Sequence, residues 1–207
     1  MANTPVKSRE TPENLAAIAV NNPSFVPTLI SSLAAKDSSK YAYAKALNLL
    51  SASHPNLLYP HFDYFVGLLN SRYKILKWNA IFILANLTTV DVEHKFDGVF
   101  DEYYHHLWDG DLITAANIVG ASGKIAVARP DLRDKITSEI LKVDVIPLPT
   151  TECREIARGK ALLAFTEYSA SLDENNFVNG FIQRCLQSRR PATRKKAEGL
   201  LKKVRDK

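Results

Sequence analysis

Apolar residues recur along the chain in a short phrase that returns five times. The phrase is a small residue, two variable positions and then two residues that are mostly apolar. Its small residues lie 34, 36, 45 and 36 positions apart, at Ala46, Ala80, Ala116, Ala161 and Ala197. Self-similarity at this period is typical of stacked helical hairpins. The pattern therefore predicts an all-α superhelix, or α-solenoid, of about five hairpins.

The phrase marks the second helix of each hairpin. We expect these helices around residues 38–53, 71–88, 111–127, 151–169 and 190–205. Candidate N-cap residues lie at or just before the start of four of these ranges, and their side-chain oxygens can accept hydrogen bonds from free backbone N–H groups. They are Asp37, Asp111, Thr150 or Thr151, and Ser188.

The ends of the array have their own signals. Thr11 and Pro12 precede an apolar run and predict a short N-terminal helix that covers the first hairpin. Residues 1–10 are polar and without periodicity, which indicates a disordered lead. Residues 143–150 contain Pro147 and Pro149, which exclude a helix interior, and this insertion explains why Ala116 and Ala161 are 45 residues apart. Its apolar residues indicate that it folds back onto the array. Residues 11–205 are expected to form a single domain.

The repeated phrase is similar to the short form of the HEAT repeat, written hydrophobic-Arg-x-x-Ala-x-x-Ala-Leu-Gly. Where that form has Arg, three residues before the alanine, this chain has Lys77, Arg158 and Arg194, but Tyr43 and Ile113 in the other two repeats. The resemblance implies a curved array whose second helices line the concave face. It also implies that the basic residues reach a turn of an adjacent repeat, where they satisfy carbonyl groups and an Asp.

A helical wheel of the second helices separates the expected core from the expected groove. At 100° per residue, positions two before, two after and five after the alanine point away from the core. In the middle of the array these positions include Trp78, Phe82, Ile118 and Leu163. An exposed apolar row favours a binding site for a protein or peptide segment. The alternative is that neighbouring repeats bury these side chains.

Charge is distributed unevenly. The chain has 27 Lys and Arg and 22 Asp and Glu, a net of +5, yet residues 184–207 alone carry a net of +8. A basic terminus can bind nucleic-acid phosphates, or it can be the polar outer cap that a solenoid needs. The basic patch on which this choice depends consists of Arg189, Arg190, Arg194, Lys195, Lys196 and Lys202.

Signals for catalysis and cofactors are absent from the sequence. It has no glycine-rich phosphate loop, no Gly-x-Ser-x-Gly and no paired-His zinc signature. The column Asp101, His105 and Asp109 is better explained by electrostatic pairing along one helix than by a metal site. We therefore expect no cofactor and no metal.

A distant enzymatic resemblance is to the HEAT-like alkylpurine DNA glycosylases, which are basic solenoids with concave tryptophans. In those enzymes a catalytic Asp follows one tryptophan by one turn, whereas Phe82 follows Trp78 here. The resemblance therefore implies nucleic-acid binding without catalysis, as the alternative to a protein-binding adaptor.

The expected location is the cytoplasm. No apolar run of eighteen residues is present to span a membrane, and the first residues lack the apolar stretch of a secretory signal. Cys153 and Cys185 are far apart and are expected to be reduced thiols.

Overall fold

The computed structural model describes residues 11–172 and 176–205, so the lead expected at 1–10 lies outside the described residues. Throughout the described part the regular structure is helical and no strand occurs. The predicted all-α fold class is confirmed. None of the helices in the described ranges is both long and apolar enough to cross a bilayer.

The chain divides into two compact units, residues 1–83 and 84–207, with the boundary inside α5. The single domain expected over 11–205 stays a prediction. The first unit contains α1 (Pro12–Asn21), α2 (Val26–Ser31), α3 (Ser39–Ser53), α4 (Phe62–Leu68) and most of α5 (Lys74–Leu87). Short 3-10 turns connect them at Pro23–Phe25, Ser32–Ala34, Pro55–Leu57 and Tyr59–His61.

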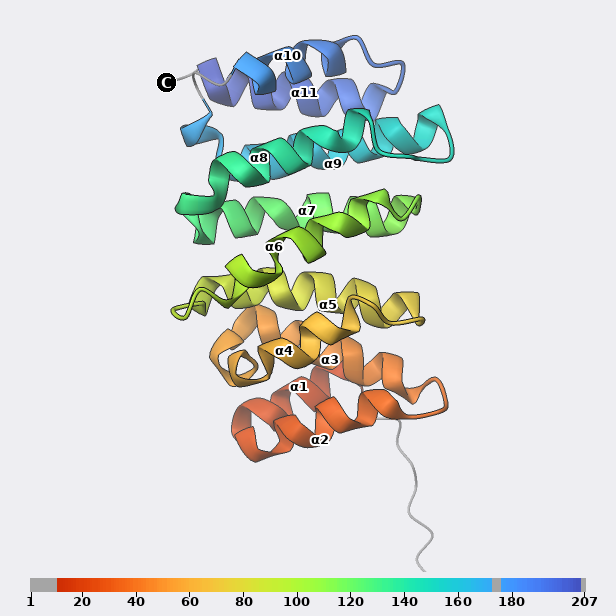
Figure 1. Ribbon diagram of the computed structural model, residues 1–207, viewed down its shortest axis with the longest axis vertical. Coiled ribbons are helices and arrows are strands. Elements are labelled where there is room, and N and C mark those ends of the chain that lie inside the picture. The colour runs from red at the N-terminus through yellow and green to blue at the C-terminus, as the bar shows by residue number, and fades with distance from the viewer. Residues whose placement is uncertain (1–10, 173–175, 206–207) are drawn as a thin grey trace, which may run out of the picture. The chain divides into compact units, whose positions relative to one another are not determined.

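The second unit continues the alternation of helices. It contains α6 (Lys95–His105), α7 (Leu112–Ala128), α8 (Arg133–Leu141), α9 (Thr151–Glu167), α10 (Asn176–Leu186) and α11 (Pro191–Arg205). Its 3-10 turns are Thr88–Val90, His106–Trp108, Pro130–Leu132, Lys142–Asp144 and Ser169–Ser171. Helices α7, α9 and α11 form one layer, in which α9 contacts both others, and α6, α8 and α10 form a second layer (Figure 1).

Side-chain caps begin several of these helices where the sequence predicts them. The Thr11 hydroxyl accepts a hydrogen bond from the backbone N–H of Asn14 at 3.2 Å. Asp111 accepts from the N–H of Ile113 at 2.9 Å, and Thr150 accepts from the N–H of Cys153 at 3.1 Å. Each bond satisfies one of the N–H groups that a helix terminus leaves without a partner.

Aromatic side chains of α6 pack in the core of the second unit. Phe96, Phe100, Tyr103 and Tyr104 are buried on one side of α6, and their rings meet at centroid distances of 4.6 to 6.2 Å. The buried Tyr104 hydroxyl donates to Ser122 Oγ on α7 at 3.0 Å, which satisfies a polar group that would otherwise be costly to bury. This contact ties the first helix of the hairpin to the second.

The insertion at 143–150 folds back onto the second unit, as its apolar content predicts. Val143 and Ile146 are fully buried. Arg154 on α9 donates to both of their carbonyl oxygens, at 2.9 and 3.1 Å. The insertion also approaches Gly110, whose φ is 73°, in the turn before α7. A Cβ on Gly110 would lie 3.5 Å from the carbonyl oxygen of Pro147.

The two cysteines are free thiols, as expected. Cys153 lies half-buried in the first turn of α9. Cys185 is fully buried on α10, and burial raises the pKa of its thiol to about 12.

Helices α7 and α9 approach each other closely at Gly123. A Cβ at this position would stand 2.9 Å from the carbonyl oxygen of Ala164 and 2.7 Å from Cδ of Glu167. Real Cβ atoms do not approach backbone oxygen this closely, so the α7–α9 spacing depends on glycine at this position.

We expect Gly123→Ala to lower the free energy of unfolding by about 1–3 kcal/mol, because the added methyl group forces α7 away from α9. Gly199→Ala is the matched control, since a Cβ on this exposed residue of α11 meets nothing within 4 Å. That variant should gain up to about 1 kcal/mol from helix propensity alone. Urea denaturation followed by circular dichroism measures both, and equal effects at the two glycines would contradict a tight α7–α9 contact.

Candidate interaction surface

Helices α7 and α9 of the second unit each present a stripe of side chains to solvent. On α9 the stripe is Glu152, Ile156, Lys160, Leu163 and Glu167, of which Ile156 is half-buried. On α7 it is Ile113, Asn117, Gly120, Lys124 and Val127, of which Asn117 and Gly120 are half-buried. Successive members are three or four residues apart, the spacing of one helix face. The face that these stripes form is called the second-helix face below.

Large aliphatic side chains stand on this face. Leu163 exposes 44% of its surface, as the wheel predicts for a residue pointing away from the core. Ile113 and Val127 on α7 expose 48% and 51%, and the wheel did not select them. The second-helix face is therefore apolar in part, with residues that differ from those expected.

The phase expected for α7 is wrong. Ile118 is fully buried on the side opposite the exposed stripe, so it cannot contact a partner at the surface. Alanines at 115 and 116 let the repeated phrase fit this helix in more than one register. Burial assigns Ile118, rather than Ala116, to the position that Ala80 and Ala161 occupy in their own helices.

The two aromatic candidates lie on α5 in the first unit. Trp78 and Phe82 are both half-buried, one turn apart on the same face. Ile75, one turn before Trp78, exposes 40% of its surface. The side chains of this face are thus partly accessible to solvent. Their role in binding stays a prediction. Because Leu163 belongs to the other unit, the contribution of Trp78, Phe82 and Leu163 to a single row stays a prediction.

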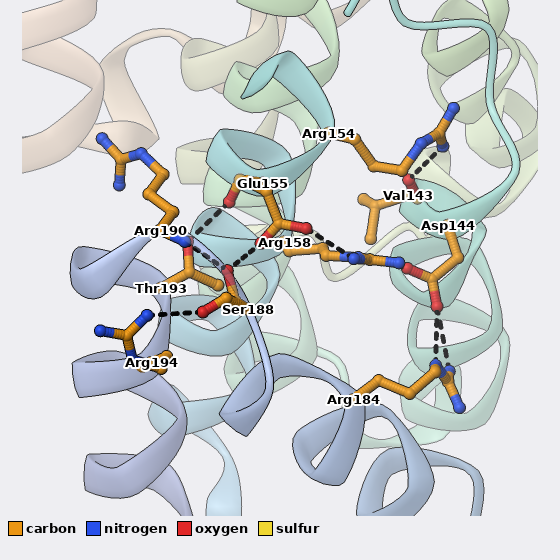
Figure 2. Close-up of polar contacts among 10 residues, drawn as sticks. All are labelled: Val143, Asp144, Arg154, Glu155, Arg158, Arg184, Ser188, Arg190, Thr193 and Arg194. Atoms are coloured by element: carbon orange, nitrogen blue, oxygen red, sulfur yellow. Dashed lines mark hydrogen bonds and ion pairs between the residues drawn. The ribbon is translucent and has the colours of Figure 1, made fainter. Parts of the chain in front are cut away.

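The arginines at the family's basic position have structural contacts. Arg158 donates from Nε to Asp144 Oδ1 at 2.7 Å and from Nη1 to Glu155 Oε1 at 2.6 Å (Figure 2). Burial disfavours its charged form, but the bonds to both carboxylates outweigh burial and raise the pKa of Arg158. Arg194 donates to the carbonyl oxygen of Ser188 at 2.7 Å. The predicted partners, an Asp and a carbonyl group, are confirmed, but they lie in each arginine's own hairpin rather than in an adjacent one.

Other polar bonds join the last two hairpins. Arg184 on α10 donates to Asp144 Oδ2 at 3.0 Å, on the carboxylate that also binds Arg158 (Figure 2). The hydroxyl of Thr193 on α11 donates to the carbonyl oxygen of Glu155 at 2.9 Å, and the Ser188 hydroxyl donates to Glu155 Oε2. This network spans the turn before α9, α9 itself, α10 and the start of α11.

The predicted basic patch divides into two groups. Arg190 donates to Glu152 Oε1 at 2.7 Å and Arg194 to a backbone carbonyl, so both are engaged within the protein. Arg189, Lys195 and Lys202 are exposed and Lys196 is half-buried. Within the described ranges these four form no ion pair. The free positive charge therefore lies mainly on α11.

The acidic and histidine residues that the sequence singled out do not assemble as one column. His106 Nδ1 lies 3.1 Å from Asp109 Oδ2 near the end of α6, whereas Asp101 and His105 line a shallow hollow with Glu139 and Lys142 of the next hairpin. A different group comes together at the start of α6: His94, Asp97 and Asp131, whose ligand-type atoms lie within 4.8 Å of one another.

Arg129 occupies the centre of that second group. Its Nη2 lies 2.6 Å from both Asp97 Oδ1 and Asp131 Oδ2, and its Nη1 lies 3.4 Å from Asp91 Oδ2. The guanidinium supplies the positive charge that these carboxylates need, which accounts for the cluster as structural. Sequence spacing gave no signal for it, because its members come from two consecutive hairpins.

Asp144→Ala should lower the free energy of unfolding by about 2 kcal/mol, because it leaves the partly buried Arg158 without its main acceptor. Arg184→Ala removes the other, 55% exposed partner of the same carboxylate and should cost less than about 1 kcal/mol. Chemical denaturation of the two variants measures the difference. Equal losses would show that the Arg158 contact is not the principal one.

Comparisons with known proteins identify the fold. No protein-family model matches the chain, and no curated protein matches it. A designed armadillo repeat protein matches with a TM-score of 0.58 at 17% identity, over 98% of this chain and 96% of that one. An engineered protein solved by a structural genomics consortium matches with a TM-score of 0.58 at 19% identity, over 94% and 89%. At these identities the likeness shows the fold alone, an all-α solenoid of helical repeats.

Proposed function

We propose that this protein is a non-catalytic helical-repeat adaptor of the HEAT or armadillo-like type, which binds a segment of another protein on its second-helix face. The observation that carries the proposal is the exposure of large aliphatic side chains on adjacent helices, Ile113 and Val127 on α7 and Leu163 on α9. The helical-repeat neighbours support it, because stacked repeats expose extended surfaces suited to binding.

The physical reason is the area that a partner would remove from water. Burying apolar surface contributes roughly 25 cal/mol per Å², and a few well-packed side chains usually dominate the energy of an interface. On α9, Leu163 is flanked by polar residues three and four positions away, Lys160 and Glu167. Apolar contacts with a polar rim are the usual composition of an interface between proteins.

The first unit has a comparable surface on α5. Trp78 and Phe82 are half-buried and Ile75 is more exposed, so the three present apolar surface along one helix face. Tryptophan is one of the residues enriched among the side chains that dominate binding. We propose that this face also contributes to binding a protein segment.

A second candidate function is nucleic-acid binding by the basic patch. It is favoured by Lys195, Lys196 and Lys202, which lie on α11 without an ion pair in the described part of the chain. Binding of this kind weakens steeply as salt is raised, because each neutralised phosphate releases a counterion. An electrophoretic shift at low salt that vanishes at high salt would support it, and no shift at low salt would exclude it.

The test of the adaptor proposal is a charge introduced at Leu163. Leu163→Glu should reduce capture of partner proteins at least about tenfold, because an unpaired carboxylate would be buried in the interface. Val145→Glu is the matched control, since Val145 is 66% exposed on the loop before α9 and is not on the second-helix face. Quantitative affinity capture with wild type and both variants provides the measurement.

Both variants must first show the circular dichroism spectrum and thermal midpoint of the wild type. Partners that are lost with Leu163→Glu and kept with Val145→Glu support the proposed surface. An identical set of partners, in equal amounts, for all three proteins would contradict it. Phe82→Glu applies the same test to the face of α5.

A further inference from the structure

Two lysines occupy equivalent positions on neighbouring second helices. Lys160 on α9 directly precedes the buried Ala161, and Lys196 on α11 directly precedes the buried Ala197. Because α9 and α11 pack against each other, this register brings the two side chains onto one face. The repeat geometry thus places one cation on each of two adjacent second helices.

A glycine of the preceding second helix lies beside each lysine. A Cβ at Gly159 would lie 3.3 Å from Lys196 Nζ and 3.6 Å from its Cδ. A Cβ at Gly120 would lie 3.8 Å from Cδ of Lys160. Each lysine therefore extends from its own helix across the backbone of the helix before it, and the ammonium group of Lys196 lies directly over α9.

These two cations have no anionic partner within the described residues. Arg190, the third cation nearby, is paired with Glu152 at 2.7 Å, whereas Lys160 and Lys196 form neither an ion pair nor a hydrogen bond in that part of the chain. Partial burial, together with the charges of Lys160 and Arg190, lowers the pKa of Lys196. Repulsion between like charges is therefore present in the protein alone and would be relieved by a bound anion.

The surroundings favour a peptide over a nucleic acid. On α9, Lys160 lies one turn after Ile156 and one turn before Leu163, so apolar side chains flank the cation on both sides. Glu167 stands at one end of the same stripe and would repel a polyanion such as DNA. An isolated anionic group between apolar side chains fits this pattern.

The number of cations indicates the charge of that group. One carboxylate would neutralise only one of the two ammonium groups, whereas a phosphorylated side chain carries about −1.5 to −2 charges and three acceptor oxygens. We propose that Lys160 and Lys196 form an anion subsite of the second-helix face that binds a phosphorylated serine or threonine of the partner segment. The proposal rests on the proposed function and names the chemistry of its ligand.

The test uses the full chain with ¹³C-labelled lysine and short peptides as probes. The probe is acetyl-Leu-Ala-phosphoserine-Ala-Leu-amide, and its serine and aspartate forms are the comparison peptides. Lys160→Gln and Lys196→Gln assign the two CεH₂ signals. The phosphopeptide should shift both CεH₂ signals, and both shifts should saturate with the same dissociation constant. The aspartate peptide should bind at least about tenfold more weakly, and the serine peptide should leave both signals unchanged.

A matched variant separates a specific subsite from general charge attraction. Lys196→Gln should weaken phosphopeptide binding at least about tenfold, since a charge-assisted hydrogen bond is lost. Lys195→Gln removes the same charge from the exposed neighbouring position of α11 and should change binding less than about twofold. Equal losses in the two variants, or parallel shifts of all lysine signals without saturation, would overturn the subsite.

Two further outcomes identify what would be wrong. If the aspartate and phosphoserine peptides bind equally tightly, the assignment to a phosphate group is wrong. If a DNA duplex saturates both signals more tightly than the phosphopeptide does, the ligand of the subsite is a nucleic acid and not a peptide. Capture that fails to depend on Leu163 while the phosphopeptide still binds would refute the proposed function alone. Normal dependence on Leu163 without any response to phosphopeptide would refute the subsite alone.

Discussion

The constraint on which the proposed surface depends is that α7 and α9, inside the second unit, are enclosed by neighbouring helices and present a single stripe of strongly exposed residues to solvent. In α7, ten residues are buried, and the accessible positions recur every three or four residues along one side. The rotation of a helix about its axis therefore decides which side chains a partner can reach. A rotation equivalent to two residues changes Ile118 from a surface residue into a core residue.

The architecture could be predicted from the sequence because it depends on repeated local features. The alternation of helices, the caps at Thr11, Asp111 and Thr150, and the folding back of the insertion are all found in the structure. The phase of α7 could not be predicted, because consecutive small residues make the buried position ambiguous and only the packing against α9 resolves it. The cluster of carboxylates around Arg129 could not be predicted either, because these carboxylates belong to different hairpins.

Charge was harder to predict than helix formation for a related reason. Arg190 and Lys196 look alike in the basic C-terminal sequence, yet Arg190 has a carboxylate opposite it and Lys196 has a glycine and another lysine. Whether a basic residue is paired depends on which side chain the adjacent hairpin places opposite it. The sequence supplies the charges, and the stacking register decides which of them remain available for a ligand.

The polar network around Asp144 and Glu155 has a consequence for how the chain unfolds. Stacked repeats behave approximately as a row of units whose stability is the sum of each unit and its interface with the next. Terminal units then tend to fray, because they have one neighbour only. Here α10 and α11 are bonded to the preceding hairpin through Arg184, Ser188 and Thr193, so their opening also breaks contacts of that hairpin. Amide hydrogen exchange in α11 should therefore be coupled to that in α9, and the C-terminal hairpin should behave as part of a larger cooperative unit.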